Sequence, residues 1–190
     1  MFFAKEIIEF LLTQVYNNQT EICGNLGKNA ETHELKILYK AVGEIDPKKG
    51  RNLCNYPDDK KYMTSYLYHT HPQTAYAYPS FEDILTVVKE RDTHVRFSSF
   101  IFTIWGVWIL MPNTDTKLEK QIDQIKKDYE RGIYHFHAKQ KAEHKSIVYT
   151  SDIDELISSY IAVVEETFNY RVSVRFVSWE KLQALEVFQI

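Results

Sequence analysis

The sequence predicts one domain of the mixed α/β class, of the α+β type, in which helices flank a mostly antiparallel sheet. A chain of 190 residues is long enough for one domain with a sizeable core. Its composition, 44% hydrophobic and 26% charged with only six Gly and five Pro, is typical of a folded soluble protein. Segments with helical spacing of apolar residues also alternate with segments rich in β-branched and aromatic residues.

The chain begins with a predicted helix and two predicted strands. Residues 4–16 place apolar side chains at helical spacing and charged ones on the opposite side, which indicates an amphipathic helix. Residues 20–27 and 34–43 are predicted strands around a polar stretch that suits a hairpin loop. Residues 46–61 contain two prolines and a glycine, so we expect a long surface loop there.

The middle of the chain predicts three more strands and a helix. Residues 62–69 alternate well enough for a strand, and a loop with two prolines and two tyrosines separates it from a helix at residues 80–91. Residues 94–104 and 107–111 are rich in Phe, Ile, Val and Trp. We expect these two segments to pair around a tight turn near Gly106.

The pattern changes after Pro112. Residues 116–132 are charged and weakly helical, and the simplest interpretation is a solvated helix face, although such a face could contact a partner. Residues 152–168 predict a stronger helix with apolar residues at core spacing. A strand at residues 171–177 and a short helix from Glu180 complete the prediction.

Charge and cysteine content limit the classes of partner and the compartment. A formal net charge of −3, without a long Lys/Arg run, argues against a nucleic-acid partner bound through its phosphates. Cys23 and Cys54 are too few for a disulfide framework and lack a C-x-x-C spacing, which fits a reducing compartment. Charged residues interrupt the apolar N-terminus, and the longest apolar run, residues 97–112, is shorter than a membrane span. We therefore expect a cytoplasmic protein that does not bind a membrane.

The strongest chemical signal is a pair of histidines followed by an aspartate. His69 and His71, at positions i and i+2 of an extended segment, point to the same side and can bind one metal ion. Asp83, in the first turn of the next predicted helix, can supply a third ligand and leave one position of a tetrahedral zinc for water. Zinc lowers the pKa of such a water to about 7. Glu21 then suits the role of general acid and base, and the Ser80 hydroxyl suits that of oxyanion donor.

Three segments carry a family resemblance: EICGNL starting at Glu21, HTHP starting at His69 and SFED starting at Ser80. In this order they resemble the motif of the JAMM/MPN (JAB-domain) zinc metallopeptidases. The resemblance implies a curved, mixed sheet and a zinc-dependent isopeptidase or peptidase that removes ubiquitin or ubiquitin-like proteins from conjugates. It also implies that His69, His71 and Asp83 bind zinc, that Glu21 acts through the zinc-bound water, and that Ser80 stabilises the tetrahedral intermediate.

The resemblance covers about residues 4–112. The interval from Pro72 to Ser80 is one residue longer than in most members, which would alter the substrate rim and the position of Ser80. We therefore expect a catalytic core at residues 1–112 and an extension at residues 113–190 packed on the same domain. Compact members of the family occur in bacteria and viruses, some of them beside conjugation enzymes in antiviral defence, but that context is an analogy only.

Each candidate residue also has an ordinary structural interpretation. Ser80 could be only the N-cap of its helix, with Asp83 at position N3, and this role is compatible with catalysis. Glu21 could pair with a surface lysine, whereas Cys23 could be a nucleophile but is better interpreted as a small buried hydrophobe. His69 and His71 could be plain strand residues.

Two further groups and two other functions stay open. His135, His137 and His144 form a second histidine group without a placed carboxylate, which favours a surface role. Tyr76 and Tyr78 could hold an extended peptide or simply cover the core. The alternative functions are a catalytically silent binding scaffold with this fold, or a peptidase that acts on a non-ubiquitin peptide.

Overall fold

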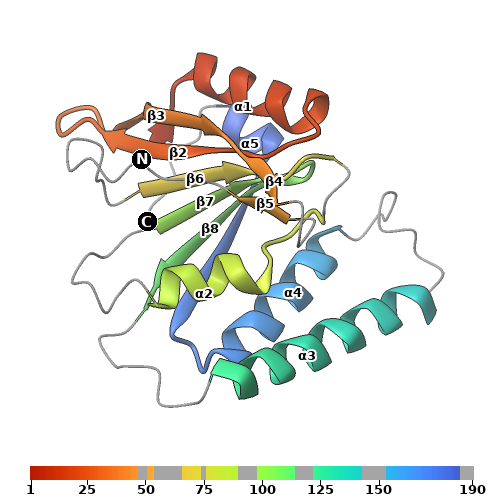
Figure 1. Cartoon of the computed structure of the whole chain (residues 1–190). Coiled ribbons are helices and arrows are strands. Elements are labelled where there is room, and N and C mark those ends of the chain that lie inside the picture. Colours follow the sequence, from red (N-terminus) through yellow and green to blue (C-terminus); the bar gives the residue numbers. More distant parts are fainter. Residues whose placement is uncertain are drawn as a thin grey trace.

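The computed structural model describes residues 1–46, 51–53, 66–73, 76–89, 98–113, 122–142 and 153–184. Within them, the fold is a curled seven-stranded mixed sheet with five helices and a separate two-stranded sheet (Figure 1). The strands are β1 (Phe2–Phe3), β2 (Ile22–Lys28), β3 (Glu34–Val42), β4 (Glu44–Asp46), β5 (Arg51–Leu53), β6 (Tyr66–Thr70), β7 (Ser98–Phe102), β8 (Gly106–Pro112) and β9 (Val172–Ser178). The helices are α1 (Lys5–Asn17), α2 (Phe81–Lys89), α3 (Ile122–Ala142), α4 (Ile153–Thr167) and α5 (Trp179–Gln183).

The large sheet has the order β1-β3-β2-β6-β7-β8-β9 and is mostly antiparallel. Only the β1–β3 and β6–β7 pairs are parallel. The predicted hairpin between β7 and β8 is confirmed. Its tight turn is closed by two backbone hydrogen bonds between Thr103 and Gly106, of 2.8 and 3.2 Å. Gly106 has a φ of 153°, and a Cβ there would lie 2.3 Å from the Val177 carbonyl oxygen, so the turn needs a glycine.

Helices α1 and α5 cover one face of the sheet, where aliphatic and aromatic side chains form one buried cluster. The buried side of α1, formed by Ile8, Leu11 and Val15, packs in a cluster with the central strands. Phe3 meets Phe100 and Phe102 edge-to-face, with ring centroids 5.6 and 5.5 Å apart. The mixed α/β architecture is confirmed, and on this side of the sheet a hydrophobic core fills the space between the strands and the two helices.

Helices α2, α3 and α4 cover the opposite face (Figure 1). Buried residues of all three helices form one cluster with β7, β8 and β9. Gly132 allows α3 and α4 to approach closely, because a Cβ there would lie 2.7 Å from Val163 Cγ1. Strand β9 pairs along β8 from Gly106 to Pro112, so the described part of the C-terminal region belongs to the same sheet and core.

Two sequence expectations are wrong in detail. The long loop expected at residues 46–61 is partly antiparallel strand, because Glu44–Asp46 pairs with Arg51–Leu53, and residues 54–61 lie outside the described residues. The weak helix expected at residues 116–132 corresponds to the 21-residue α3, which continues ten residues further, while residues 116–121 lie outside the described residues. It is more than a solvated face, since Ile125 and Tyr129 are buried against the core.

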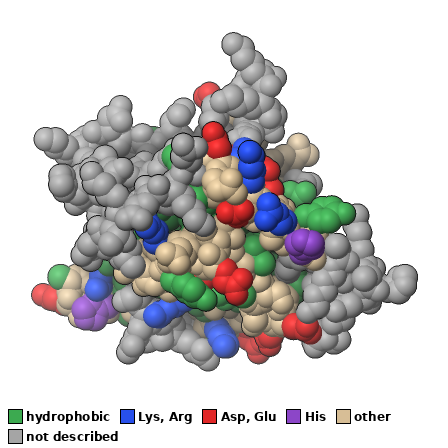
Figure 2. All heavy atoms as spheres, turned by 90° about the horizontal axis from the view of Figure 1, so that it is seen from below, with side chains coloured by type: hydrophobic (Ala, Val, Ile, Leu, Met, Phe, Trp, Pro, Cys, Tyr) green, Lys and Arg blue, Asp and Glu red, His purple; other side chains and the backbone are tan. Residues whose placement is uncertain are grey.

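The outward side of α3 mixes charge types. Viewed from below Figure 1, its described acidic, basic and hydrophobic side chains lie interspersed (Figure 2). Over residues 122–135, the part of α3 whose side chains the structure describes, the exposed ones are Ile122, Asp123, Gln124, Lys127, Glu130, Arg131, Tyr134 and His135. None of the helices, over the parts searched, combines the length and apolar character of a membrane span.

Candidate metal centre

The two histidines come from the end of β6 and the residue after it. His69 lies opposite Cys23 of β2 and Ile101 of β7. His71 continues the extended segment, because its N–H donates to the Phe102 carbonyl at 2.7 Å. Thr70 between them turns its hydroxyl to the Ile22 N–H at 2.9 Å. Alternation along the strand therefore sends both imidazoles to the face covered by α2.

The aspartate comes from the first turn of α2. The Ser80 N–H donates to Asp83 Oδ2 at 2.6 Å, and the Asp83 N–H donates to Ser80 Oγ at 3.2 Å. This reciprocal pair is a capping box, which satisfies two backbone donors at the helix start and fixes the first turn. The local sequence thus sets the position of the Asp83 carboxylate.

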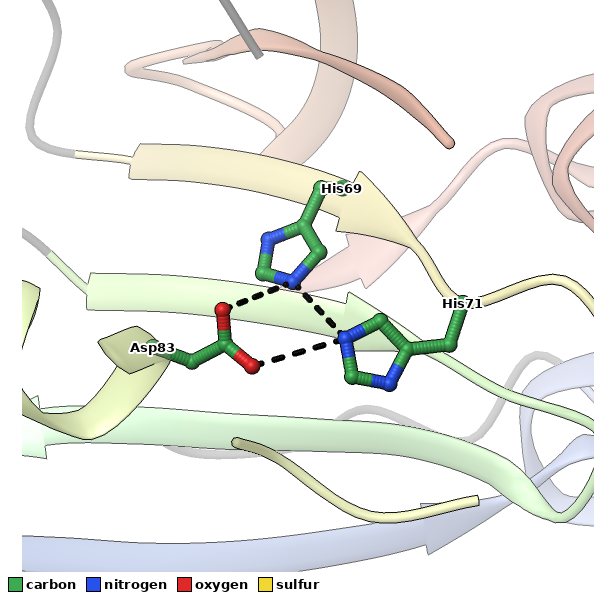
Figure 3. Close-up of side chains that lie close together, drawn as sticks. All are labelled: His69, His71 and Asp83. Atoms are coloured by element: carbon green, nitrogen blue, oxygen red, sulfur yellow. Dashed lines mark hydrogen bonds and ion pairs between the residues drawn. The ribbon is translucent and has the colours of Figure 1, made fainter. Parts of the chain in front are cut away.

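The three side chains converge on one point (Figure 3). The two histidine Nε2 atoms lie 3.2 Å apart, and they lie 3.2 and 3.4 Å from Oδ1 and Oδ2 of Asp83. Two ligand atoms that are each about 2.0–2.1 Å from a tetrahedral zinc lie about 3.3–3.4 Å from each other. The ligand atoms of His69, His71 and Asp83 therefore form a group that can bind a metal ion.

A backbone carbonyl orients the second histidine. His71 Nδ1 lies 3.0 Å from the Tyr76 carbonyl oxygen, which can only accept a hydrogen bond. The proton of a neutral ring then resides on Nδ1, and the lone pair of Nε2 points toward the cluster. Metal-binding histidines usually have such an outer partner, which fixes their tautomer and ring orientation.

The electrostatics of the cluster favour a positive charge at its centre. Burial alone would raise the pKa of Asp83, but the charge of His69 and hydrogen bonds from both rings hold that pKa well below its ordinary value. Burial alone would lower the pKa of His71, yet the Asp83 hydrogen bond and the Asp83 and Glu21 charges raise it overall. A proton or a divalent cation can supply the positive charge that these carboxylates favour.

Glu21 lies next to this group, at the start of β2. The register between β2 and β6 ends with Cys23 opposite His69, and the antiparallel direction of the two strands brings Glu21 to the same end as His71. The backbone holds this position, because the Gly43 N–H donates to the Glu21 carbonyl at 2.7 Å. The half-buried Glu21 side chain therefore borders the His71 side of the centre, and its charge acts on His71.

Ser80 is exposed and immediately precedes the first turn of α2, which carries Asp83. Its hydroxyl oxygen accepts the Asp83 N–H, which leaves its own proton available as a donor. Capping and donation to a substrate oxygen are therefore compatible in this geometry.

The remaining candidate residues have different settings. Cys23 is fully buried and disulfide-bonded, so the nucleophile interpretation and the expectation of reduced cysteines are both wrong for it. Cys54, the only other cysteine in the sequence, lies outside the described residues. A low cysteine count excludes a disulfide framework but not a single bridge.

The two tyrosines of the loop before Ser80 separate into two roles. Tyr78 is buried and covers the core, whereas Tyr76 is 68% exposed and stacks on Tyr78 with ring centroids 5.2 Å apart. His135 is exposed on α3, and the side chains of His137 and His144 lie outside the described residues.

Sequence reasoning missed the contacts that hold the loop before Ser80. Trp108 Nε1 donates to the Ala77 carbonyl at 2.8 Å. The hydroxyls of Tyr160 and Tyr129 donate to the Pro79 carbonyl at 2.6 and 3.2 Å. The only sequence signal for the two tyrosines was their place on the apolar sides of helices, which predicts burial but no partner.

In comparisons with known proteins, no family model matches the chain and no curated protein matches it. The functional interpretation therefore rests on the short motifs of the sequence and on the geometry of the metal centre.

Proposed function

We propose that this chain is a zinc-dependent hydrolase of the JAMM/MPN type, which cleaves at the C-terminus of a ubiquitin or ubiquitin-like protein. The observation that supports it is the convergence of His69, His71 and Asp83, with 3.2–3.4 Å between their ligand atoms. The substrate class comes from the resemblance of the EICGNL, HTHP and SFED segments to that family, in the same order along the chain.

The donor set favours zinc over the common hard cations. Two imidazole nitrogens and one carboxylate form the kind of three-ligand site that catalytic zinc occupies. Calcium and magnesium instead require six or more oxygen ligands, or several waters around one or two carboxylates. Both histidines are buried, at 7% and 6% exposure, so their imidazoles are preorganised for an ion and not spread in solvent.

In the proposed reaction, the protein residues position the ion, the water and the scissile amide. His69, His71 and Asp83 would hold the zinc ion, which when bound would lower the pKa of a water enough for attack near neutral pH. Glu21 accepts the proton of the attacking water and delivers it to the leaving amine, since it borders the His71 side of the centre. The Ser80 hydroxyl donates to the carbonyl oxygen as negative charge develops on it.

The surroundings of the centre suit an extended peptide substrate. The backbone carbonyl of Tyr76 orients His71, and the Tyr76 ring is exposed. A flat aromatic ring stacked on a buried neighbour gives a rigid apolar surface at low entropic cost. We therefore assign the exposed Tyr76 ring to the surface against which the modifier tail would lie.

Metal analysis and a cleavage panel test this function. The purified full chain is expected to contain about one zinc, and to cleave one or more ubiquitin-like fusions in a manner that a chelator abolishes and added zinc restores. Short peptides without a modifier serve as the comparison substrates. A chain that contains and takes up no zinc, or that shows no chelator-sensitive cleavage of any substrate, contradicts the proposal, and the second result favours a binding scaffold.

A further inference from the structure

We propose that Tyr160 and Tyr129, from the two C-terminal helices, are positioning residues of the metal centre: their hydroxyls bind the Pro79 carbonyl and thereby hold the turn that presents Asp83. The inference rests on the proposed metal site, and it assigns a role to a region for which the motifs give none. Tyr160 belongs to α4 and Tyr129 to α3.

The contact is made at the residue next to the helix cap. Pro79 is buried and immediately precedes Ser80, whose backbone and hydroxyl form the capping box with Asp83. Ser80 also starts the helix through its carbonyl, which accepts the Ile84 N–H at 3.3 Å. A displacement of Pro79 therefore passes directly to Ser80, and from Ser80 to the Asp83 carboxylate.

The two hydroxyls are not equivalent. Each has one proton, and the Tyr160 hydroxyl makes the shorter bond to Pro79, at 2.6 Å against 3.2 Å for Tyr129. The Tyr129 hydroxyl also lies 3.3 Å from that of Tyr160, so its proton can go to either acceptor. Tyr160 is thus the principal donor, and Tyr129 supports it.

Ring packing fixes both hydroxyls against the turn. The Tyr160 ring lies between Tyr78 and Trp108, with centroids 4.9 and 5.0 Å away. The Tyr129 ring packs against Phe81, the first residue of α2, at 5.4 Å. The residues on both sides of the Pro79–Ser80 pair are therefore packed by the same two tyrosines that bind its carbonyl.

Both tyrosines are buried and keep their protons. Burial raises the pKa of Tyr160 and of Tyr129, and the negative charge of Asp83 raises each further. Neutral hydroxyls are therefore available as donors across the working pH range.

Tyrosine-to-phenylalanine variants of the full chain test the proposal, because they remove the hydroxyl and keep the ring. Tyr160→Phe is expected to weaken zinc binding about tenfold, at the lower end of the effect of losing an outer partner of a metal ligand. The double variant Tyr160→Phe/Tyr129→Phe should lose more zinc affinity than Tyr160→Phe, and Tyr129→Phe alone should lose less. Affinity is measured by competition with a chromophoric chelator, and the visible spectrum of the cobalt-loaded chain reports the ligand geometry.

A matched control removes an equally buried hydroxyl on the opposite face. Tyr68 is fully buried in the cluster under α1, and Tyr68→Phe should leave zinc affinity and the cobalt spectrum unchanged. If Tyr68→Phe weakens zinc binding as much as Tyr160→Phe, the effect is general and the proposal is overturned. Wild-type affinity and an unchanged cobalt spectrum in the double variant overturn it as well.

Hydrogen exchange separates this inference from the proposed function. In chelator, the amides of Asp83 and Ile84 should exchange several-fold faster in Tyr160→Phe than in the wild type, while the β7–β8 amides stay unchanged. This measurement needs no metal. A wild type that binds no zinc would therefore contradict the proposed hydrolase, whereas unchanged exchange at Asp83 and Ile84 would contradict only the positioning role.

Discussion

Buried aromatic rings line both faces of the sheet, but the hydrogen-bond donors on those rings bind different segments of the chain. Under α1 and α5, Phe3 contacts Phe100 and Phe102, and the Trp179 indole donates to the Thr103 carbonyl in the β7–β8 turn. Under α2, α3 and α4, buried rings also carry hydroxyl or indole donors, and these donors bind carbonyls of the loop that leads to Asp83. The first face stabilises the sheet. The second face both stabilises it and positions the candidate metal ligands.

This difference has a physical basis. A loop that crosses a hydrophobic layer must satisfy its backbone carbonyls, because an unsatisfied buried polar group costs about 1–3 kcal/mol. On the site face, Trp108 and Tyr160 satisfy the carbonyls of Ala77 and Pro79. Bonds that satisfy these carbonyls thus also hold the loop that leads to the candidate metal ligands, and substitutions on the two faces should be separable by their effect on metal binding.

The largest effect is expected when a metal ligand is removed. His69→Ala should lose zinc and all chelator-sensitive cleavage, because even an outer partner of a ligand contributes about 10–100-fold to metal affinity. Elemental analysis and a competition titration measure the loss. His135→Ala is the control, since His135 is an exposed histidine on α3. Zinc retained at wild-type affinity in His69→Ala would remove His69 from the centre.

Glu21→Gln should give the next largest effect, on turnover and not on zinc content. The loss of a general acid and base slows a reaction by about 10²–10⁴-fold. Because glutamine keeps the size of the side chain and Glu21 is not in the ligand group, zinc stoichiometry and the melting temperature should remain close to wild type. Cleavage rates at saturating substrate measure the effect. Full activity in this variant would contradict the assigned role of Glu21.

A pair of phenylalanine substitutions compares the faces directly. Phe102 lies under α1, and Phe81 is the first residue of α2 and packs against Tyr129; each is replaced by alanine. Each should lower the free energy of unfolding by about 3–5 kcal/mol, because each leaves a cavity in a packed core. Denaturant unfolding measures that loss, and zinc titration is done where both chains are folded. Only Phe81→Ala should also weaken zinc binding; equal weakening by both would erase the distinction between the faces.

The features that the sequence predicted well depend on local signals. The amphipathic pattern of α1, the turn at Gly106 and the helix start at Ser80 are each set within a few residues, and each forms as predicted. The clustering of His69, His71 and Asp83 was also within reach, since strand alternation and a first-turn carboxylate constrain their directions.

The features that sequence reasoning missed depend on long-range contacts. Tyr160 and Pro79 are 81 residues apart, and Tyr129 and Pro79 are 50 apart, so no local pattern announces their hydrogen bonds. The extent of α3 was missed because charged residues weaken its apolar stripe, while its burial comes from packing against α4. Short strands such as β1 were missed because two residues carry no periodicity.

The two N-cap serines give the finest comparison, because they perform the same local task on opposite sides of the sheet. Ser80 caps α2 at the metal centre, and Ser178 caps α5 by accepting the Lys181 N–H at 3.4 Å. Ser80→Ala and Ser178→Ala should each cost about 0.5–2 kcal/mol of unfolding free energy, as measured in denaturant. If Ser80 also donates to the substrate oxygen, its variant alone should lose about 10²–10³-fold in turnover.

The control for that last effect is built into the pair. Loss of a cap lowers stability in both variants, so a fall in turnover that accompanies both would reflect destabilisation of the fold. A fall confined to Ser80→Ala separates donation from capping only if zinc stays bound, because the same hydroxyl also holds the Asp83 N–H. Ser80→Gly sharpens this point, since glycine is a better cap than alanine. A turnover defect that persists in Ser80→Gly with full zinc content must then arise from the missing hydroxyl itself.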